Sequence, residues 1–421
     1  MNSKKNSAPS RKGFVANYPN FRHWKTTDSR EMTQKPINIY LHIPFCIQRC
    51  AYCYYSTIKL KGSGRSERLE KYVNTLCREI ELASQYFNLK ERPVVSIYIG
   101  GGTPTVMNEE LFRKVTEHLH RYLNIDNSEF TVEAEPVTLT QKKADLLESL
   151  GINRISLGVQ SFHDDILELC DRLDKEDKAL KAISLARGTG AAVNIDLLSG
   201  LAGETPDTWA YTLERALSTE AESITVYKME LYANTEYYKR IRKKEIHLPR
   251  DDQELEFMQY AMDKFDHAQY LPWSFFTFTK NGDYEHKYAT SIWRGTDCYA
   301  FGVSSFGEMG TWLFQNTNDQ EKYMELVNAG EIPINRGYHL TSLDQMVRTV
   351  MLEMKLVRLD LNAFQNRYGF RLESLCADTM DQLVSEGYIC LNNGGIEKTR
   401  KGLLYGDYAG KQLAGALKEM F

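Results

Sequence analysis

The sequence has no unbroken apolar run near the roughly 18 residues that a membrane-spanning helix needs, and its mean hydropathy is −0.46. It also has little excess of either charge, since 52 Lys and Arg face 56 Asp and Glu for a net charge of −4. A slightly acidic chain is not typical of general nucleic-acid or anionic-membrane binding. The polar segment MNSKKNSAPSRKG lacks the apolar stretch of a secretory signal. These absences predict a cytoplasmic protein that binds neither membranes nor nucleic acids. We expect it to be a monomer.

Cysteine is sparse, with eight in 421 residues, and its distribution is uneven. Five cysteines stand singly, mostly in apolar or helical contexts where a free thiol behaves as a small hydrophobic group. The other three, Cys46, Cys50 and Cys53, fall within eight positions. In a chain without a secretory signal, such a cluster indicates metal binding or redox chemistry rather than a structural disulfide.

From Ile37 onward, short β-rich runs alternate with amphipathic helical stretches. The six predicted strands are INIYLHI (37–43), VVSIYIG (94–100), FTVEA (130–134), RISLGV (154–159), AVNIDLL (192–198) and SITVYKME (223–230). Between them, apolar residues recur at helical spacing, and Gly151 and Gly190 follow two of the helices as stop signals. Single crossover helices between strands produce parallel βαβ units, because each crossover is right-handed. Six such units predict either a partial barrel or a doubly wound sheet.

The predicted fold class is α/β, a partial (β/α)6 TIM-like barrel followed by a helical, winged-helix-like C-terminal domain. We expect an N-terminal arm over 1–36 that is partly disordered, the barrel with a charged helical excursion over 37–315, and a lid domain over 316–421. The last part contains three helical stretches and then YICLNNGGIEKTRKG, which predicts two short strands around an Asn-Asn-Gly-Gly turn. That order of elements is typical of a small winged-helix-like module.

The three clustered cysteines have the spacing C-x3-C-x2-C directly after the first predicted strand. Thiolates are soft ligands that suit zinc or iron–sulfur clusters. A structural zinc site needs four filled positions, and only His42 offers a fourth ligand nearby. Three thiolates in one loop instead hold three corners of a [4Fe–4S] cluster and leave one iron open for an amine and a carboxylate. The position also fits, because active sites of parallel α/β barrels lie at the carboxyl ends of the strands.

With Tyr52 just before its last cysteine, the loop resembles the signature of the radical S-adenosylmethionine (SAM) superfamily. Three later segments, IYIGGGTPT, NRISLGVQSF and NIDLLSGLAGET, resemble motifs of the oxygen-independent coproporphyrinogen III oxidase family. That family also contains haem chaperones and the class C radical SAM methylases, which use two SAM molecules. The resemblance runs from about Ile37 to Gly310 and implies a [4Fe–4S] cluster and SAM, with two SAM molecules expected.

The resemblance implies that Cys46, Cys50 and Cys53 bind the cluster. The residues it places around SAM are Tyr40, Tyr52, Gly101, Gly102, Thr103, Glu133, Gln160, Arg172, Asp196 and Phe306. Among them Gly101 and Phe306 match contacts to the first SAM, whereas Gly102, Thr103, Gln160 and Arg172 match contacts to the second. Tyr40 and Glu133 are expected to be catalytic.

A carboxylate such as Asp196 within a parallel strand is costly to bury without a partner. The cationic SAM would serve as that partner. A local salt bridge between Asp196 and Arg172 is the alternative.

The reaction expected first is class C methylation or cyclopropanation of an sp2 carbon, with the second SAM as the carbon donor. The alternative is oxygen-independent coproporphyrinogen III oxidation, by decarboxylation of porphyrinogen propionates, or a related haem chaperone. Against the oxidase, Tyr55 stands where that pattern has a further cysteine, and Lys228 and Met229 replace an expected Asn-Tyr pair. Against the chaperone, about 36 residues precede the first strand. A winged-helix regulator is disfavoured because its candidate recognition helix, DTMDQLVSEG, is acidic.

The expected partners are a flat, unsaturated or aromatic small molecule and a reductant such as flavodoxin or ferredoxin. The aromatic segment from Tyr270 to Trp312 offers side chains for the pocket of such a substrate, although aromatic residues of this kind also build ordinary cores.

Overall fold

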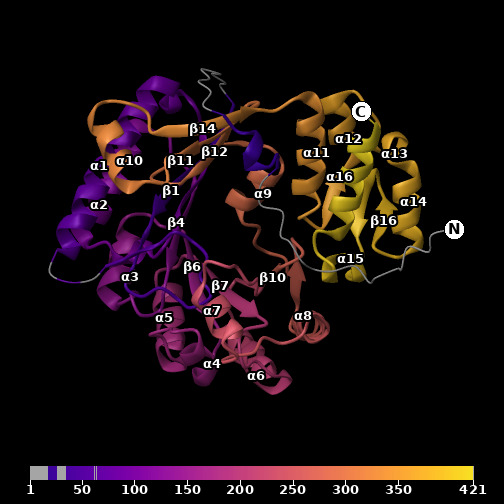
Figure 1. Ribbon diagram of the computed structural model, residues 1–421, viewed down its shortest axis with the longest axis horizontal. Coiled ribbons are helices and arrows are strands. Elements are labelled where there is room, and N and C mark those ends of the chain that lie inside the picture. The colour runs from indigo at the N-terminus through magenta and orange to yellow at the C-terminus, as the bar shows by residue number, and fades with distance from the viewer. Residues whose placement is uncertain (1–17, 26–34, 61, 63, 421) are drawn as a thin grey trace.

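The computed structural model describes residues 18–25, 35–60, 62 and 64–420. Much of the predicted N-terminal arm, residues 1–17 and 26–34, lies outside the described residues. The barrel strands and the helices around them form one part of the molecule, and the C-terminal helices α11 to α16 group beside it (Figure 1). No helix within the described ranges is both long enough and apolar enough to cross a bilayer.

The barrel sheet has twelve strands in the order β14-β13-β12-β11-β1-β4-β5-β6-β7-β8-β10-β9. The parallel strands are β1 (Ile37–Ile43), β4 (Val94–Gly101), β5 (Glu129–Ala134), β6 (Arg154–Gln160), β7 (Ala192–Ser199), β8 (Ser223–Lys228) and β11 (Asp297–Phe301). The antiparallel edges are β9 (Tyr270–Pro272), β10 (Thr277–Lys280), β12 (Phe306–Met309), β13 (Trp312–Asn316) and β14 (Ile334–His339). The six predicted parallel strands are therefore confirmed as neighbours in chain order, and β11 extends them on the β1 side.

The crossover helices match the predicted amphipathic stretches, apart from the short helix α4 (Asp164–Leu169), which was not predicted. Their bounds are α1 (Arg65–Phe87), α2 (Glu109–Tyr122), α3 (Gln141–Ser149), α4 (Asp164–Leu169), α5 (Glu176–Gly188) and α6 (Pro206–Ser218). Side chains of Asn108, Thr140 and Thr205 cap the first turns of α2, α3 and α6, which is why these helices begin where they do.

The charged stretch after β8 forms two helices, α7 (Glu236–Arg242) and α8 (Asp251–His267). Lys244 adopts a left-handed φ of 62° between them, and Pro249 precedes the second helix. A non-glycine residue in that conformation ends a helix, because it cannot continue the right-handed turn. Two shorter helices follow, α9 (Lys287–Trp293) and α10 (Gln320–Asn328).

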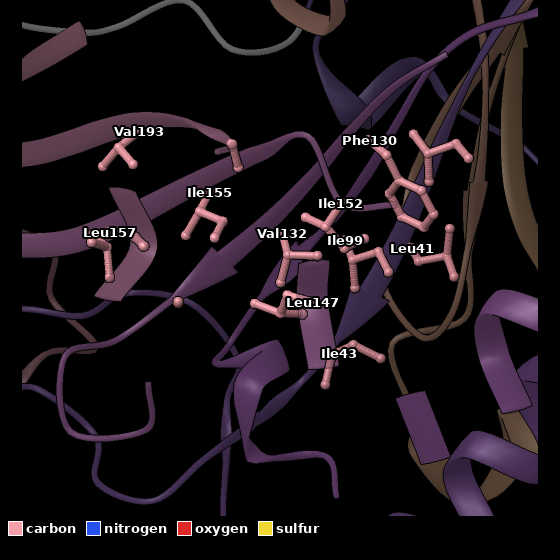
Figure 2. Packing of buried hydrophobic residues seen from close by; sticks show 14 of the residues in the cluster. Leu41, Ile43, Ile99, Phe130, Val132, Leu147, Ile152, Ile155, Leu157 and Val193 are labelled. Carbon is pink, nitrogen blue, oxygen red and sulfur yellow. The ribbon is translucent and has the colours of Figure 1, made fainter. Parts of the chain in front are cut away.

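Alternate residues of the parallel strands face the helices and form the main core. Ile99 of β4, Val132 of β5 and Ile155 of β6 are fully buried and belong to one apolar cluster. Figure 2 shows these strand side chains gathered with Leu147 of α3. Successive strand residues point to opposite faces, so the same pattern sends the residues between them into the barrel.

The interior of the barrel is polar. Asn38 of β1 accepts a hydrogen bond from Ser96 of β4 at 2.6 Å, and Asn194 of β7 accepts hydrogen bonds from Ser223 and Thr225 at 2.7 and 3.0 Å. These contacts satisfy buried polar groups that would otherwise destabilise the strands. The polar interior leads to the carboxyl ends of the strands, where the candidate site lies.

The C-terminal domain packs around a second apolar cluster drawn mainly from residues 346–417. Its helices are α11 (Ser342–Glu353), α12 (Leu361–Tyr368), α13 (Leu372–Leu375), α14 (Ala377–Ser385), α15 (Arg400–Leu404) and α16 (Tyr408–Met420). The strands β15 (Arg358–Asp360), β16 (Ile389–Asn392) and β17 (Gly395–Lys398) form a small sheet in the order β15-β17-β16. The helical domain with its hairpin agrees with the predicted fold class. The barrel sheet itself runs on through β14, past position 315.

Candidate active site

The three clustered cysteines line one cavity of about 420 Å³ at the carboxyl ends of the parallel strands. Cys46 ends the short strand β2 (Phe45–Cys46), which pairs with β3 (Ile58–Lys59), and Cys50 and Cys53 follow in a loop. None of the three forms a disulfide. Burial raises the pKa of the Cys46 thiol to about 12 and that of Cys50 to about 11. A metal must therefore displace protons from these thiols when it binds.

The cysteine loop is held at both sides by backbone contacts. Ala51 donates its N–H to the Cys170 carbonyl, and its own carbonyl accepts from the Tyr237 N–H, both at 2.9 Å. Arg49 donates to the Cys53 carbonyl at 3.0 Å. A loop pinned in this way presents its sulfur atoms in a defined place, as cluster binding requires.

The glycine run after β4 passes directly beneath this loop. Gly102 donates to the Ile43 carbonyl at 2.8 Å, and Thr103 donates to the Phe45 carbonyl at 2.7 Å. A Cβ at Gly102 would lie 2.6 Å from the Phe45 carbonyl oxygen and 3.0 Å from Cys46 Sγ. Glycine is thus required here by the close approach of the cysteine loop, whereas the resemblance assigned Gly102 to a contact with the second SAM.

Glu133 lies at the end of β5, inside the barrel and against the cavity. Its carboxylate accepts from the Tyr98 hydroxyl at 2.7 Å and from the Gly101 N–H at 2.8 Å. Burial raises the pKa of Glu133 to about 7. The geometry leaves a buried carboxylate facing the cavity, where a cationic ligand would favour its ionised form.

Asp196 on β7 accepts hydrogen bonds from Ser156 and Asn194, both at 2.9 Å. Burial raises the pKa of Asp196 to about 6. The alternative of a salt bridge between Asp196 and Arg172 is wrong, because Arg172 pairs with Asp174 at 2.7 Å and approaches Glu135 at 3.9 Å. Its direct hydrogen-bond donors are neutral, the nearby Arg154 guanidinium partly offsets the effect of burial on its pKa, and Asp196 lines the cavity.

Arg172 instead points toward the cysteine loop. Its Nη1 donates to Tyr52 Oη at 3.3 Å and lies 3.5 Å from Cys50 Sγ, while Nη2 donates to the Gly158 carbonyl at 2.6 Å. A guanidinium in this position stabilises negative charge on the Cys50 sulfur. The contact with Cys50 was not predicted, because nothing in the sequence relates positions 50 and 172.

The other predicted site residues divide into two groups. Gln160, in a left-handed conformation with φ 70°, and Gly101 line the cavity. Tyr40, Thr103 and Phe306 are not among the described residues that line it. The Tyr40 hydroxyl is 3.0 Å from His42 Nδ1, deeper in the barrel, and Phe306 is 38% exposed with its ring stacked on Phe21. Their expected roles at SAM stay predictions.

Several residues that line the cavity were not among the predicted site residues. They include Tyr54, Tyr55, Tyr98, Tyr227 and Tyr232 on the barrel side and Tyr405, Asp407, Tyr408 and Lys411 from the C-terminal domain. Side chains alternate between the two faces of a strand, so the pattern that places Thr225 inside the barrel also places Tyr227 there. Tyr227 could therefore have been identified from the sequence. The C-terminal residues could not have been identified in this way, because only the packing of the two domains brings them to the cavity.

The donor set fits an iron–sulfur cluster. Three free thiols face one cavity, and a guanidinium lies beside one of them. Across the described ranges, no three His, Cys, Asp or Glu side chains converge on a point where one metal ion could bind. A single zinc ion needs such convergence, whereas the corners of a [4Fe–4S] cluster are spread apart. Fold and site together define a class, that of partial-barrel proteins with a cluster-binding loop after the first strand.

Comparison with known proteins identifies the family. Residues 40–216 match the model of the radical SAM superfamily, and residues 340–405 match that of the HemN C-terminal domain. The chain is 30% identical to heme chaperone HemW of Bacillus subtilis (strain 168) over 372 residues, which cover 87% of this chain and 96% of that protein. It is 28% identical to the oxygen-independent coproporphyrinogen III oxidase of Pseudomonas aeruginosa over 400 residues, covering 90% and 85%.

A solved structure shares the fold. Coproporphyrinogen III oxidase (HemN) from Escherichia coli superposes with a TM-score of 0.78 at 23% identity, over 92% of this chain and 91% of that one. The chain belongs to the radical SAM superfamily, in the family of oxygen-independent coproporphyrinogen III oxidases and their relatives. A [4Fe–4S] cluster and SAM are the cofactors of that superfamily. The relatives named here are oxidases and chaperones, so they favour the alternative reaction above methyl transfer.

Proposed function

We propose that this protein is a radical SAM enzyme that acts on a cyclic tetrapyrrole. The observation that carries the proposal is one continuous cavity, lined by the three cysteines, by Glu133 and Asp196, and by aromatic side chains of both domains. The names of the relatives supply the substrate class, since a haem chaperone and a coproporphyrinogen oxidase both handle a tetrapyrrole.

The residues of the chain then have defined tasks. Cys46, Cys50 and Cys53 would hold the cluster, which when bound supplies the electron that cleaves SAM to methionine and a hydrogen-abstracting 5′-deoxyadenosyl radical. Glu133, held by Gly101 and Tyr98, would bind the SAM ammonium group. A substrate seated over the exposed aromatic wall of the cavity would exclude water, which protects a reactive radical from side reactions.

A second candidate, transfer of a carbon from a second SAM to an sp2 carbon, is favoured by one specific feature. Asp196, Gln160 and Arg172 form a polar group on the same cavity as Glu133. The direct hydrogen-bond donors to Asp196 are the neutral Ser156 and Asn194, and the nearby Arg154 guanidinium lowers its pKa. A second sulfonium ligand would add further positive charge beside this carboxylate. The two candidates are distinguished by their products.

The test uses the full chain, reconstituted anaerobically with iron and sulfide and then given dithionite and methyl-deuterated SAM. Coproporphyrinogen III and coproporphyrin III are supplied in parallel, and mass spectrometry follows nucleosides and tetrapyrroles. Unlabelled 5′-deoxyadenosine with loss of carbon dioxide from the substrate supports the oxidase reaction. Deuterium in 5′-deoxyadenosine with S-adenosylhomocysteine supports carbon transfer. Absence of SAM cleavage by loaded protein contradicts both.

The cysteines offer a matched control for the same assay. Cys46→Ala should remove SAM cleavage and most bound iron, because it deletes one of three cluster ligands. Cys390→Ala changes a half-buried thiol of β16, in the C-terminal domain, and should retain both. Equal iron content in the two variants would contradict the assignment of the cluster to this loop.

A further inference from the structure

Three tyrosines form a continuous stack at the cavity. The Tyr54 and Tyr55 ring centroids are 4.4 Å apart at an interplanar angle of 26°, and those of Tyr54 and Tyr232 are 4.2 Å apart at 30°. Their exposed fractions are 41%, 51% and 36% respectively. All three line the cavity. We call Tyr54, Tyr55 and Tyr232 the tyrosine stack.

The tyrosine stack joins two loops that are fixed to each other. Tyr54 and Tyr55 follow the last cluster cysteine, whereas Tyr232 lies between β8 and α7. Asn234 donates to the Tyr54 carbonyl at 3.0 Å, and the Tyr232 hydroxyl donates to Glu230 at 2.9 Å. The rings are thus held in place before any ligand arrives, which lowers the entropy cost of binding.

Other aromatic rings line the same cavity. Tyr227, also exposed, packs against Phe276 with ring centroids 5.3 Å apart, and the C-terminal domain contributes Tyr405 and Tyr408. Contiguous exposed aromatic surface of this kind marks a binding site, because leaving it in water is unfavourable. Stacked, nearly parallel rings favour a ligand that is itself flat and conjugated.

We propose that the tyrosine stack binds the face of a planar tetrapyrrole and selects the oxidised, conjugated ring over the reduced porphyrinogen. In a porphyrinogen the four bridging carbons are sp3, so the pyrrole rings tilt out of one plane and present no continuous π face. A porphyrin or haem presents such a face. Tyr55 is an end ring of the stack, and its outer face is available to such a ligand at the cavity. The proposal rests on the tetrapyrrole assignment of the proposed function, and within that assignment it favours a porphyrin or haem ligand over the porphyrinogen that an oxidase would decarboxylate.

The test compares two ligands that carry the same carboxylates and differ only in ring oxidation, coproporphyrin III and coproporphyrinogen III. Reconstituted full-length protein is titrated anaerobically, with porphyrin fluorescence reporting binding of the first and competition reporting the second. The wild type should bind coproporphyrin about tenfold or more tighter than coproporphyrinogen. A flat ligand can stack only on an outer face of the three rings, and Tyr55 is the end ring that lies toward Glu133. Tyr55→Leu should therefore weaken coproporphyrin binding by about threefold to tenfold and coproporphyrinogen binding by much less, whereas Tyr232→Leu, at the other end, should have a smaller effect on coproporphyrin.

Tyr260→Leu is the matched control, because Tyr260 is 37% exposed on α8 and is not among the residues lining the cavity. It should leave both affinities unchanged. Coproporphyrinogen binding reports whether each variant is folded. A misfolded variant loses binding of both ligands and also loses its iron. If the wild type binds the two rings with equal affinity, or if iron-loaded variants lose affinity for both rings equally, the proposed selectivity of the tyrosine stack is wrong but the tetrapyrrole assignment stands. Wild-type protein that binds neither ring overturns the tetrapyrrole assignment and the inference with it.

Discussion

The Gly101 N–H donates to Glu133 Oε2 at 2.8 Å, and this bond joins the end of β4 to the end of β5 at the floor of the cavity. Gly101 has a φ of 115°, and a Cβ there would lie 2.5 Å from the His42 ring. Only glycine turns the backbone in this way without strain. The carboxylate is therefore oriented by the same short segment that supports the cysteine loop.

Replacing Gly102 by alanine should destabilise the loop and lower its iron content. The new methyl group would meet the Phe45 carbonyl and Cys46 Sγ, and overpacking of this kind costs about 1–3 kcal/mol. Gly188→Ala is the control, because open space surrounds that position at the end of α5. Urea unfolding and iron analysis check the prediction, and equal behaviour of the two variants would contradict it.

Binding of SAM should depend on pH through Glu133. Its pKa of about 7 means that the carboxyl is neutral below pH 7 and ionised above it. A cationic ligand prefers the ionised form, so affinity should fall by up to about tenfold per pH unit below pH 7. Glu133→Gln should bind SAM weakly and lose this component of the pH dependence in equilibrium dialysis between pH 5.5 and 8.5.

Glu79→Gln is the control for that measurement. Glu79 is also buried with a pKa raised to about 7, but it is not among the residues that line the cavity. It should keep the wild-type pH profile of SAM binding. A profile that persists unchanged in Glu133→Gln would assign the titration to another group.

Removal of the Arg172 guanidinium should make the cluster harder to reduce. Arg172 Nη1 lies 3.5 Å from Cys50 Sγ, and loss of a buried positive charge beside a thiolate ligand disfavours an added electron. Arg172→Gln should therefore shift the midpoint potential to a more negative value in a titration followed by electron paramagnetic resonance. Arg172→Lys should restore part of the shift.

Arg240→Gln is the matched control, because Arg240 pairs with Asp171 at 2.6 Å and is partly exposed. The cluster of Arg240→Gln should have the same midpoint potential as that of the wild type. An unchanged potential in fully loaded Arg172→Gln would show that this guanidinium does not act on the cluster.

Tyr323→Phe should destabilise the protein more at pH 8 than at pH 5.5. Tyr323 donates to Glu79 at 2.6 Å, and the raised pKa of Glu79 keeps its carboxyl neutral below pH 7. A carboxyl whose pKa is raised from 4.5 to about 7 loses stability as pH rises from about 4.5 to 7, and hydrogen bonds to the ionised form limit that loss. The lost bond should cost about 1.5–3 kcal/mol above pH 7 and less below it in urea unfolding. Equal losses at both pH values would contradict this account.

Local patterns account for most of the fold that was predicted. The period-2 runs of β1 and β4 to β8 lie on the strands of the structure, because one face of each must be apolar to meet the helices. The cysteine spacing also lies within one loop, so its chemistry is visible in a few consecutive residues. The break between α7 and α8 was not predicted. It depends on a left-handed conformation at Lys244, and the periodicity of apolar residues carries no information about such a conformation.

The sequence by itself determined the six parallel strands, the cluster loop and the carboxylates Glu133 and Asp196 on two of those strands, since each depends on neighbours in the chain. Tertiary structure alone decided three other features: the approach of Arg172 to Cys50, the tyrosine stack, and the entry of C-terminal residues into the cavity. Each joins segments far apart in sequence. Their geometry depends on how strands, loops and domains pack, and that packing leaves no mark in the spacing of any one segment.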